Sequence, residues 1–417
     1  MAGQRDRTSR ASVRGLMTGF PVPPERRVPA TGVYESQAAN RWFMQHVRRV
    51  LGTADLRGPC DAQGDRPRAR SRPLPVALRD LDGLRIGGEG RARGPTLAQV
   101  LRRTATDGFL VIADGAIVVE RYFHGMTPAT AHMWQSVSKS LVSCVAGGLV
   151  DDGRVDLARK VTTYVPELAG SAYGGALVEH LLDMQVGIDY SEDYDDPDAE
   201  VNDLDRLYGV RPPRRVGEPG STYDYARATR PRGRHGERFD YVSLNVNVLA
   251  WVLERATGRA LPDLIHDEVW GALGGEHDAY IALDVAGSAQ AESGVCSSLR
   301  DLGRLGLALA RGGRLGGRRV VAPDWVRSIR RGGDVALFAA RDEAGILPHG
   351  SYRRGFWVAH SGGRSVFMAL GIYGQMLYVD PQADVVVAKF STQAVADDLE
   401  CFRLEFALAE RLAAALA

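Results

Sequence analysis

The sequence predicts an α/β (α+β) chain in which one antiparallel sheet, flanked by N- and C-terminal helices, is interrupted by an inserted helical domain. Three observations predict this class. Short apolar runs typical of strands occur near both ends of the chain, at 109–123 and from 365 onward. The region between them, 155–290, has helical apolar spacing and long loops. A C-terminal helical pattern, LEFALAERLAAALA, follows the last strand.

The predicted units follow in order along the chain. Residues 1–40 contain many Arg, Pro and Gly residues without apolar periodicity, and we expect an extended N-terminal arm there. We expect the α/β sheet domain to comprise 41–135 and 291–417. The mainly helical domain is expected at 136–290.

Individual elements have recognisable signals. A hairpin is predicted where two apolar runs meet at Asp114-Gly115, in FLVIADGAIVVERYF. A buried amphipathic helix is predicted to begin near Ser136, in SLVSCVAGGLVDDG, and a further helix, VSLNVNVLAWVLERATG, is predicted to end at Gly258. The closing strands are predicted in SVFMALGI, QMLYVD and VVVAKFS.

Composition excludes several classes of function. The 417 residues include 52 basic and 51 acidic side chains, so a net charge of +1 gives no field for nucleic acid or an anionic membrane. No run of 18 apolar residues is present, and the N-terminus has no signal-peptide core. The four cysteines lack C-x-x-C spacing. We expect a soluble, cytoplasmic protein.

Lysine is rare in this chain. Lys139, Lys160 and Lys389 are its three lysines, and every other basic side chain apart from histidine is Arg. Arginine stays charged, whereas a partly buried lysine can lose its proton and act as a base. Each lysine therefore merits attention.

Ser136 and Lys139 form the first candidate catalytic pair, in WQSVSKS. Three residues are close to one helical turn, so the hydroxyl and the amine share a face. A desolvated lysine can activate a serine nucleophile, and the helix N-terminus offers N–H groups to an oxyanion. The alternative is a serine N-cap beside a solvated lysine.

Tyr241 is the next candidate, in FDYVSLNVNVLAWV, immediately before a predicted helix. Beside a cationic lysine, a tyrosine can exist as phenolate or exchange its proton, and so act as general base and acid. The alternative is a tyrosine that packs on the core. No G-x-S-x-G, H-E-x-x-H or Walker sequence is present, and we expect no metal or cofactor.

At these residues the chain resembles a known family. The segments SVSKSLVSCVAGGLVDDGRVD, TTYVPELAGSAYGG, LLDMQVGIDYSEDYDDPDAEV, FDYVSLNVNVLAWVLERATG and GIYGQMLYVDP resemble the 6-aminohexanoate-dimer hydrolases, the nylon-oligomer-degrading branch of the serine β-lactamase-like, penicillin-recognising esterases. The similarity runs from about residue 105 to the C-terminus. The first motif is common to all penicillin-recognising serine enzymes, whereas the acidic loop DYSEDYDDPDAEV is specific to this branch.

The resemblance implies a serine β-lactamase-like fold and a set of catalytic roles. Ser136 would be the acyl-forming nucleophile, Lys139 its activator and Tyr241 a proton relay. The backbone N–H groups of Ser136 and Ile372 would form the oxyanion hole. At 369–371 the chain has Ala-Leu-Gly where β-lactamases usually have Lys-Thr-Gly, so we do not expect β-lactamase activity.

The resemblance also implies substrate contacts. Tyr194 would close over the substrate and hydrogen-bond the scissile amide, Asp205 would receive a free amino end, and Trp357 would form a pocket wall. Glu292 stands where efficient amide hydrolases of the branch have Asn, and Gln290 where they have an aromatic residue. Without the resemblance, the acidic loop would be interpreted as a solvated surface run.

These observations favour a serine hydrolase that cleaves small amides or esters through an acyl-enzyme. Two alternatives stay open: a carboxylesterase with little amidase activity, and an inactive penicillin-fold binding module. The expected partner is a small-molecule substrate, with no nucleic acid and no membrane, and a homodimer is left open.

Overall fold

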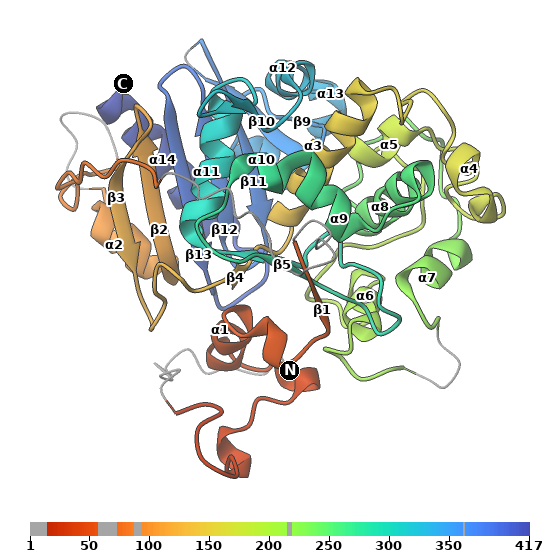
Figure 1. Cartoon of the computed structure of the whole chain (residues 1–417), viewed down its shortest axis with the longest axis horizontal. Helices are drawn as coiled ribbons and strands as arrows, with labels where there is room; N and C mark the ends of the chain where they lie inside the picture. The colour runs from red at the N-terminus through yellow and green to blue at the C-terminus, as the bar shows by residue number, and fades with distance from the viewer. Residues whose placement is uncertain (1–14, 57–72, 87–93, 215–218, 362) are drawn as a thin grey trace, which may run out of the picture.

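A seven-stranded antiparallel sheet forms the centre of the molecule (Figure 1). The computed structural model describes residues 15–56, 73–86, 94–214, 219–361 and 363–417. The strands lie in the order β3-β2-β13-β12-β11-β10-β9, and all neighbours are antiparallel. Their bounds are β2 (Thr106–Ala113), β3 (Ala116–Tyr122), β9 (Ser351–Arg353), β10 (Phe356–Ser361), β11 (Arg364–Gly371), β12 (Gln375–Asp380) and β13 (Val385–Ser391).

The strands near the two chain ends meet in this sheet, as predicted. β2 pairs with β13, so the early hairpin extends the sheet formed by the C-terminal strands. At the hairpin turn, Asp114 and Gly115 have φ of 51° and 76°. Two successive positive φ values are typical of the type I′ turn that the Asp-Gly pair predicts. The predicted hairpin is confirmed.

Helices cover both faces of the sheet. α11 (Leu299–Ala310) packs across β2, β12 and β13. The approach is close, because a Cβ on Gly306 would lie 2.5 Å from Cγ1 of Val386. α2 (Leu97–Arg103) packs on β2 and α14 (Leu399–Leu416) on β13, and these two helices contact each other. The antiparallel sheet with flanking helices confirms the predicted fold class.

The middle of the chain is mainly helical and lies beside the sheet (Figure 1). Its helices are α3 (Val137–Asp151), α4 (Val161–Tyr164), η4 (Pro166–Leu168), α5 (Val178–Leu182), α6 (Val201–Leu207), α7 (Thr222–Ala228), α8 (Leu244–Thr257), α9 (Leu261–Ile265), η5 (His266–Trp270) and α10 (Gly271–Leu273). α8 ends at Gly258, whose φ is 69°, as predicted.

Smaller elements complete the described chain. A four-stranded sheet has the order β1-β5-β6-β4, and β7 pairs with β8. These strands are β1 (Thr53–Asp55), β4 (His132–Met133), β5 (Tyr280–Ala282), β6 (Val295–Ser297), β7 (Arg314–Leu315) and β8 (Arg318–Arg319). The remaining helices are α12 (Pro323–Arg331), α13 (Val335–Phe338) and η6 (Asp342–Gly345). Across the described ranges, no helix combines the length and the apolar character needed to span a bilayer.

Helix α3 differs from the amphipathic helix that the sequence predicts. Its polar face is buried as well as its apolar face, and three serines make this possible. Ser138 accepts a hydrogen bond from the N–H of Val295, while Ser140 and Ser143 donate to carbonyls of the β9–β10 turn. Buried hydroxyls with partners cost little, so the helix can run through the core.

The N-terminal segment is more structured than the extended arm predicted for 1–40. Residues 1–14 of the predicted arm lie outside the described residues. The rest contains η1 (Pro24–Arg26), η2 (Ala30–Gly32) and the start of α1 (Gln37–Met44), and η3 (Val47–Arg49) follows. Trp42 and Phe43 are buried in the core. These turns are too short to give apolar periodicity, which explains why the sequence did not indicate them.

Candidate active site

Ser136 and Lys139 meet at the start of α3. The Lys139 Nζ donates to Ser136 Oγ at 2.6 Å and to the carbonyl of Glu292 at 3.2 Å. Lys139 is only 2% exposed, and this burial lowers its pKa to about 8. The negative charges of Glu192 and Glu292 act in the opposite direction and raise its pKa. A lysine with such a pKa has a substantial neutral fraction near neutral pH and can accept a proton.

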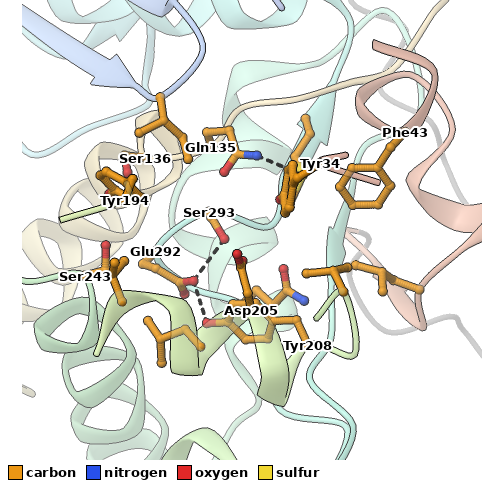
Figure 2. Close-up of a pocket in the computed structure, with 17 residues that line it drawn as sticks. Tyr34, Phe43, Gln135, Ser136, Tyr194, Asp205, Tyr208, Ser243, Glu292 and Ser293 are labelled. Atoms are coloured by element: carbon orange, nitrogen blue, oxygen red, sulfur yellow. Dashed lines mark hydrogen bonds between the residues drawn. The ribbon is translucent and has the colours of Figure 1, made fainter. Parts of the chain in front are cut away.

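The turn before α3 presents the serine. Gln135 has φ of 49°, an unusual value for a residue with a side chain, and it directs the chain from β4 into the helix. Its side chain is buried and forms a hydrogen bond with Tyr34, seen in Figure 2. Ser136 itself is the N-cap of α3 and makes no capping bond with its side chain, so its hydroxyl is available for Lys139.

Tyr241 lies beside the pair, just before α8. The Lys139 Nζ is 5.1 Å from the centre of the Tyr241 ring, and Tyr241 hydrogen-bonds Ser136. Burial raises the pKa of Tyr241 far above its ordinary value, although the bond to Ser136 opposes this. Tyr241 is therefore a phenol rather than a phenolate near neutral pH. Trp357 stacks on its ring at 5.4 Å between centroids.

The end of strand β11 lies against the nucleophile. A Cβ on Gly371 would be 3.1 Å from the backbone nitrogen of Ser136 and 2.8 Å from the carbonyl of Trp134. Glycine therefore allows the closest approach between this strand and the start of α3. Ile372 follows directly and lines the same cavities as Ser136. The two predicted oxyanion-hole residues are thus neighbours in space.

Two cavities have Ser136 as a common lining residue. The smaller, of about 40 Å³, contains Tyr194, Asp205 and Glu292 (Figure 2). The larger, of about 330 Å³, extends past Tyr241 and Trp357 toward the start of α14. Its charged lining residues are Glu192, Asp193, Arg341, Glu343, Asp397, Asp398 and Glu405. A substrate whose scissile carbonyl lies at Ser136 could therefore extend into both cavities.

Asp205 and Glu292 both line the smaller cavity, but their surroundings differ. Asp205 is ion-paired with Arg211, whose Nε lies 2.8 Å from its Oδ2. Glu292 is 3% exposed and makes no direct ion pair among the described residues, although its charge acts on the nearby Lys139. Its Oε1 accepts from Tyr208 and Ser293, while its buried Oε2 has no hydrogen-bond partner. Glu292 is therefore the carboxylate with an unused acceptor.

Glu192 is a site residue that the sequence did not single out. Its Oε1 accepts from Tyr194 at 2.7 Å and from the Ser243 hydroxyl, and its Oε2 accepts from the Ser243 N–H at 3.0 Å. Burial raises its pKa. The acidic run around it resembled a solvated loop, and no local signal distinguished one carboxylate from the others.

The N-terminal segment and Gln290 also reach the site. Tyr34 and Phe43 line the smaller cavity, and their rings meet edge-on at 5.9 Å. Gln290 lines it too and donates from Nε2 to the carbonyl of Leu283 at 3.2 Å. A segment about 100 residues before Ser136 gives no local indication that it will form a pocket wall.

Comparisons with known proteins agree on the family. The beta-lactamase family model matches residues 96–410. A 6-aminohexanoate-dimer hydrolase from Paenarthrobacter ureafaciens is 38% identical over 364 residues, which cover 87% of this chain and 88% of that protein. A solved structure from Bacillus anthracis, provisionally named a 6-aminohexanoate-dimer hydrolase, is 26% identical with a TM-score of 0.78, covering 94% of this chain and 98% of that one.

A more distant solved structure shares the fold. A family VIII carboxylesterase is 20% identical with a TM-score of 0.54, and the match covers 73% of this chain and 92% of that one. With a matched region that spans most of the chain and a relative at 38% identity, the chain belongs to the beta-lactamase family of hydrolases and resembles the 6-aminohexanoate-dimer hydrolases within it.

Proposed function

We propose that this chain cleaves amide or ester bonds through an acyl-enzyme formed on Ser136. The observation that carries the proposal is the contact between Lys139 Nζ and Ser136 Oγ at 2.6 Å, inside a buried site where the pKa of Lys139 falls to about 8. A serine needs a base in contact to become a nucleophile, and this lysine has the right place and proton affinity.

Acylation begins when neutral Lys139 accepts the Ser136 proton and the oxygen attacks the carbonyl carbon. The oxyanion then receives hydrogen bonds from the N–H groups of Ser136 and Ile372. Such preorganised donors stabilise the developing charge because they need no rearrangement during the reaction. The start of α3 adds the positive end of a 15-residue helix dipole.

Expulsion of an amine requires a proton, and Tyr241 can donate it. Because its raised pKa keeps Tyr241 protonated, it acts as a relay: it gives its proton to the leaving nitrogen and regains one from Lys139. The stacked Trp357 fixes the ring for this transfer. Water then attacks the acyl-enzyme, and Lys139 and Tyr241 carry its proton to Ser136 Oγ. This step releases the acid and restores Ser136.

The smaller cavity supports substrates that bear an ammonium group several carbons from the scissile carbonyl. Glu292 lines this cavity without a direct ion pair, so its carboxylate can attract such a group, whereas Asp205 is already paired with Arg211. The relative from Paenarthrobacter ureafaciens is named for the 6-aminohexanoate dimer, which has this kind of amino end. We propose ω-aminoacyl amides or esters as the substrate class.

The proposal is tested by comparing the linear 6-aminohexanoate dimer with a 6-aminohexanoyl ester on wild type and Ser136→Ala. We expect wild type to cleave both and the variant to cleave neither. Cleavage of the ester alone by wild type would make the chain a carboxylesterase. Cleavage of neither by a folded wild type would favour an inactive binding module.

A further inference from the structure

Lys389 is the second buried lysine of the chain and has no part in the chemistry above. It lies on β13, is 1% exposed, and points to the face of the sheet that α14 covers. Its Nζ donates to Glu405 Oε1 of α14 at 2.7 Å and also to the Ser391 hydroxyl. Glu405 lines the larger cavity beside Ser136, and Lys389 lies behind it in the core.

The same ammonium group contacts the turn between β11 and β12. Residues 372–374 connect β11 to β12, and Tyr373 and Gly374 have φ of 63° and 87°. Lys389 Nζ donates to the carbonyl of Gly374 at 3.2 Å. Gly374 adopts such a φ at no cost, but a tyrosine with positive φ is uncommon and costs free energy that surrounding contacts must offset. Lys389 supplies one of these contacts.

Further bonds fix the same turn from neighbouring residues. The buried amide of Gln375 donates to the carbonyl of Ile372 at 3.1 Å and to that of Ser391 at 2.8 Å. Gln393 donates from its side chain to Glu405 Oε1 at 2.8 Å and from its backbone to the carbonyl of Tyr373 at 3.1 Å. The N–H of Ile372 is assigned to the oxyanion hole. Through these bonds, the backbone at Ile372 is connected to the hydrogen-bond network around Lys389 and Glu405.

Stability alone does not account for this pair. Replacing a buried ion pair by apolar side chains of similar volume is often neutral or stabilising, because both charges must be desolvated. The geometry indicates a structural role for the pair. The Lys389 ammonium group, on β13, donates hydrogen bonds to α14 and to the turn that follows Gly371. That turn ends the strand whose Gly371 lies against the Ser136 nitrogen.

We propose that the Lys389–Glu405 ion pair positions the oxyanion hole by fixing the turn at 372–374, so that the N–H of Ile372 stays in line with that of Ser136. The inference rests on the proposed function, because it assigns these two amides to the oxyanion. Lys389 touches no reacting atom and is a positioning residue. A displacement of about 1 Å in such a group can cost up to about a hundredfold in rate.

The test uses the double variant Lys389→Met/Glu405→Leu, which removes both charges and leaves no unpaired carboxylate in the core. The full chain is assayed with an ester and with the matching thionoester, in which sulfur replaces the carbonyl oxygen. Lys160→Met, at an exposed lysine, is the matched control. Circular dichroism and the melting temperature establish folding, and Lys389→Met alone shows the effect of leaving Glu405 unpaired.

We expect the double variant to fold, to lose about tenfold to a hundredfold in kcat, and to keep KM within about threefold. Its preference for the oxygen ester over the thionoester should shrink, because a displaced oxyanion hole discriminates less against sulfur. A folded double variant with wild-type kcat, or one with reduced kcat but an unchanged oxygen-to-sulfur preference, would overturn the inference. Failure of the proposed function is separate, since wild type itself would then cleave no ester.

Discussion

Lys139 is suited to act as a base because burial lowers its pKa to about 8. The neutral form is the active one, so kcat/KM should rise as pH rises through about 8 and level off above it. Lys139→Arg should lose at least about a hundredfold, because a guanidinium stays charged. Lys160→Arg serves as the control. A pH–rate profile without an ionisation in this region, or an active Lys139→Arg, would make Lys139 structural.

Asp205 and Glu292 should differ in their effect on cationic substrates. The resemblance implied that Asp205 receives the free amino end, but Arg211 neutralises Asp205, whereas Glu292 Oε2 has no hydrogen-bond partner. Glu292→Gln should lower kcat/KM for a 6-aminohexanoyl amide by more than about tenfold relative to its N-acetylated counterpart. Asp205→Asn should have a smaller effect. Equal losses on both substrates for Glu292→Gln would show that it does not bind the ammonium.

Tyr194 should matter more for amides than for esters. Its hydroxyl donates to Glu192 at 2.7 Å, which leaves the oxygen lone pairs free to accept the scissile N–H and orient the nitrogen. An ester has no N–H, so Tyr194→Phe should reduce kcat/KM for an amide by about tenfold and hardly change that of the matching ester. If both substrates lose equally, the hydroxyl has only a packing role.

The sequence could predict some of these residues and not others, for a physical reason. The spacing of Ser136 and Lys139 on one helix is a local property and therefore visible in the sequence. The bonds of Glu192 with Ser243, 51 residues along the chain, depend on how the acidic loop folds against the start of α8. A carboxylate in an acidic loop has no local feature that shows which side chain it will meet.

Strand β11 and helix α3 are in contact through a glycine. A Cβ on Gly371 would lie 2.8 Å from the Trp134 carbonyl, so Gly371→Ala should push the strand from the helix and widen the oxyanion hole. We expect kcat to fall about tenfold or more while the protein stays folded. Gly170→Ala is the control, because nothing lies within 4 Å of its Cβ position. An unchanged kcat in Gly371→Ala would separate this contact from catalysis.

Regular elements were predictable where the pattern is periodic or the turn is distinctive. The Asp114-Gly115 hairpin and the end of α8 at Gly258 both depend on a backbone conformation that particular residues favour. Burial of the polar face of α3 was not predictable, because its serines find their partners far along the chain, in β6 and in the β9–β10 turn. The short turns of the N-terminal segment have no period to detect.

At the scale of the whole molecule, Ser136 lies where the sheet, the helical middle and the N-terminal segment meet. Strands from both chain ends pair in the sheet, and the interior strand β11 reaches the start of α3 from more than 200 residues away. The net charge of the chain is nearly neutral, at +1, whereas the charged residues that line the two cavities are mainly acidic. Overall charge therefore does not indicate the charge preference of the site.

Covalent labelling tests the nucleophile most directly. Wild type and Ser136→Ala would be treated with a fluorophosphonate, and the adduct would be located by intact-mass measurement and peptide mapping. We predict one adduct, on Ser136, and none in Ser136→Ala, which should fold normally because Ser136 makes no capping bond with its side chain. A label on another residue, or turnover by Ser136→Ala above a few per cent of wild type, would contradict the assignment of Ser136.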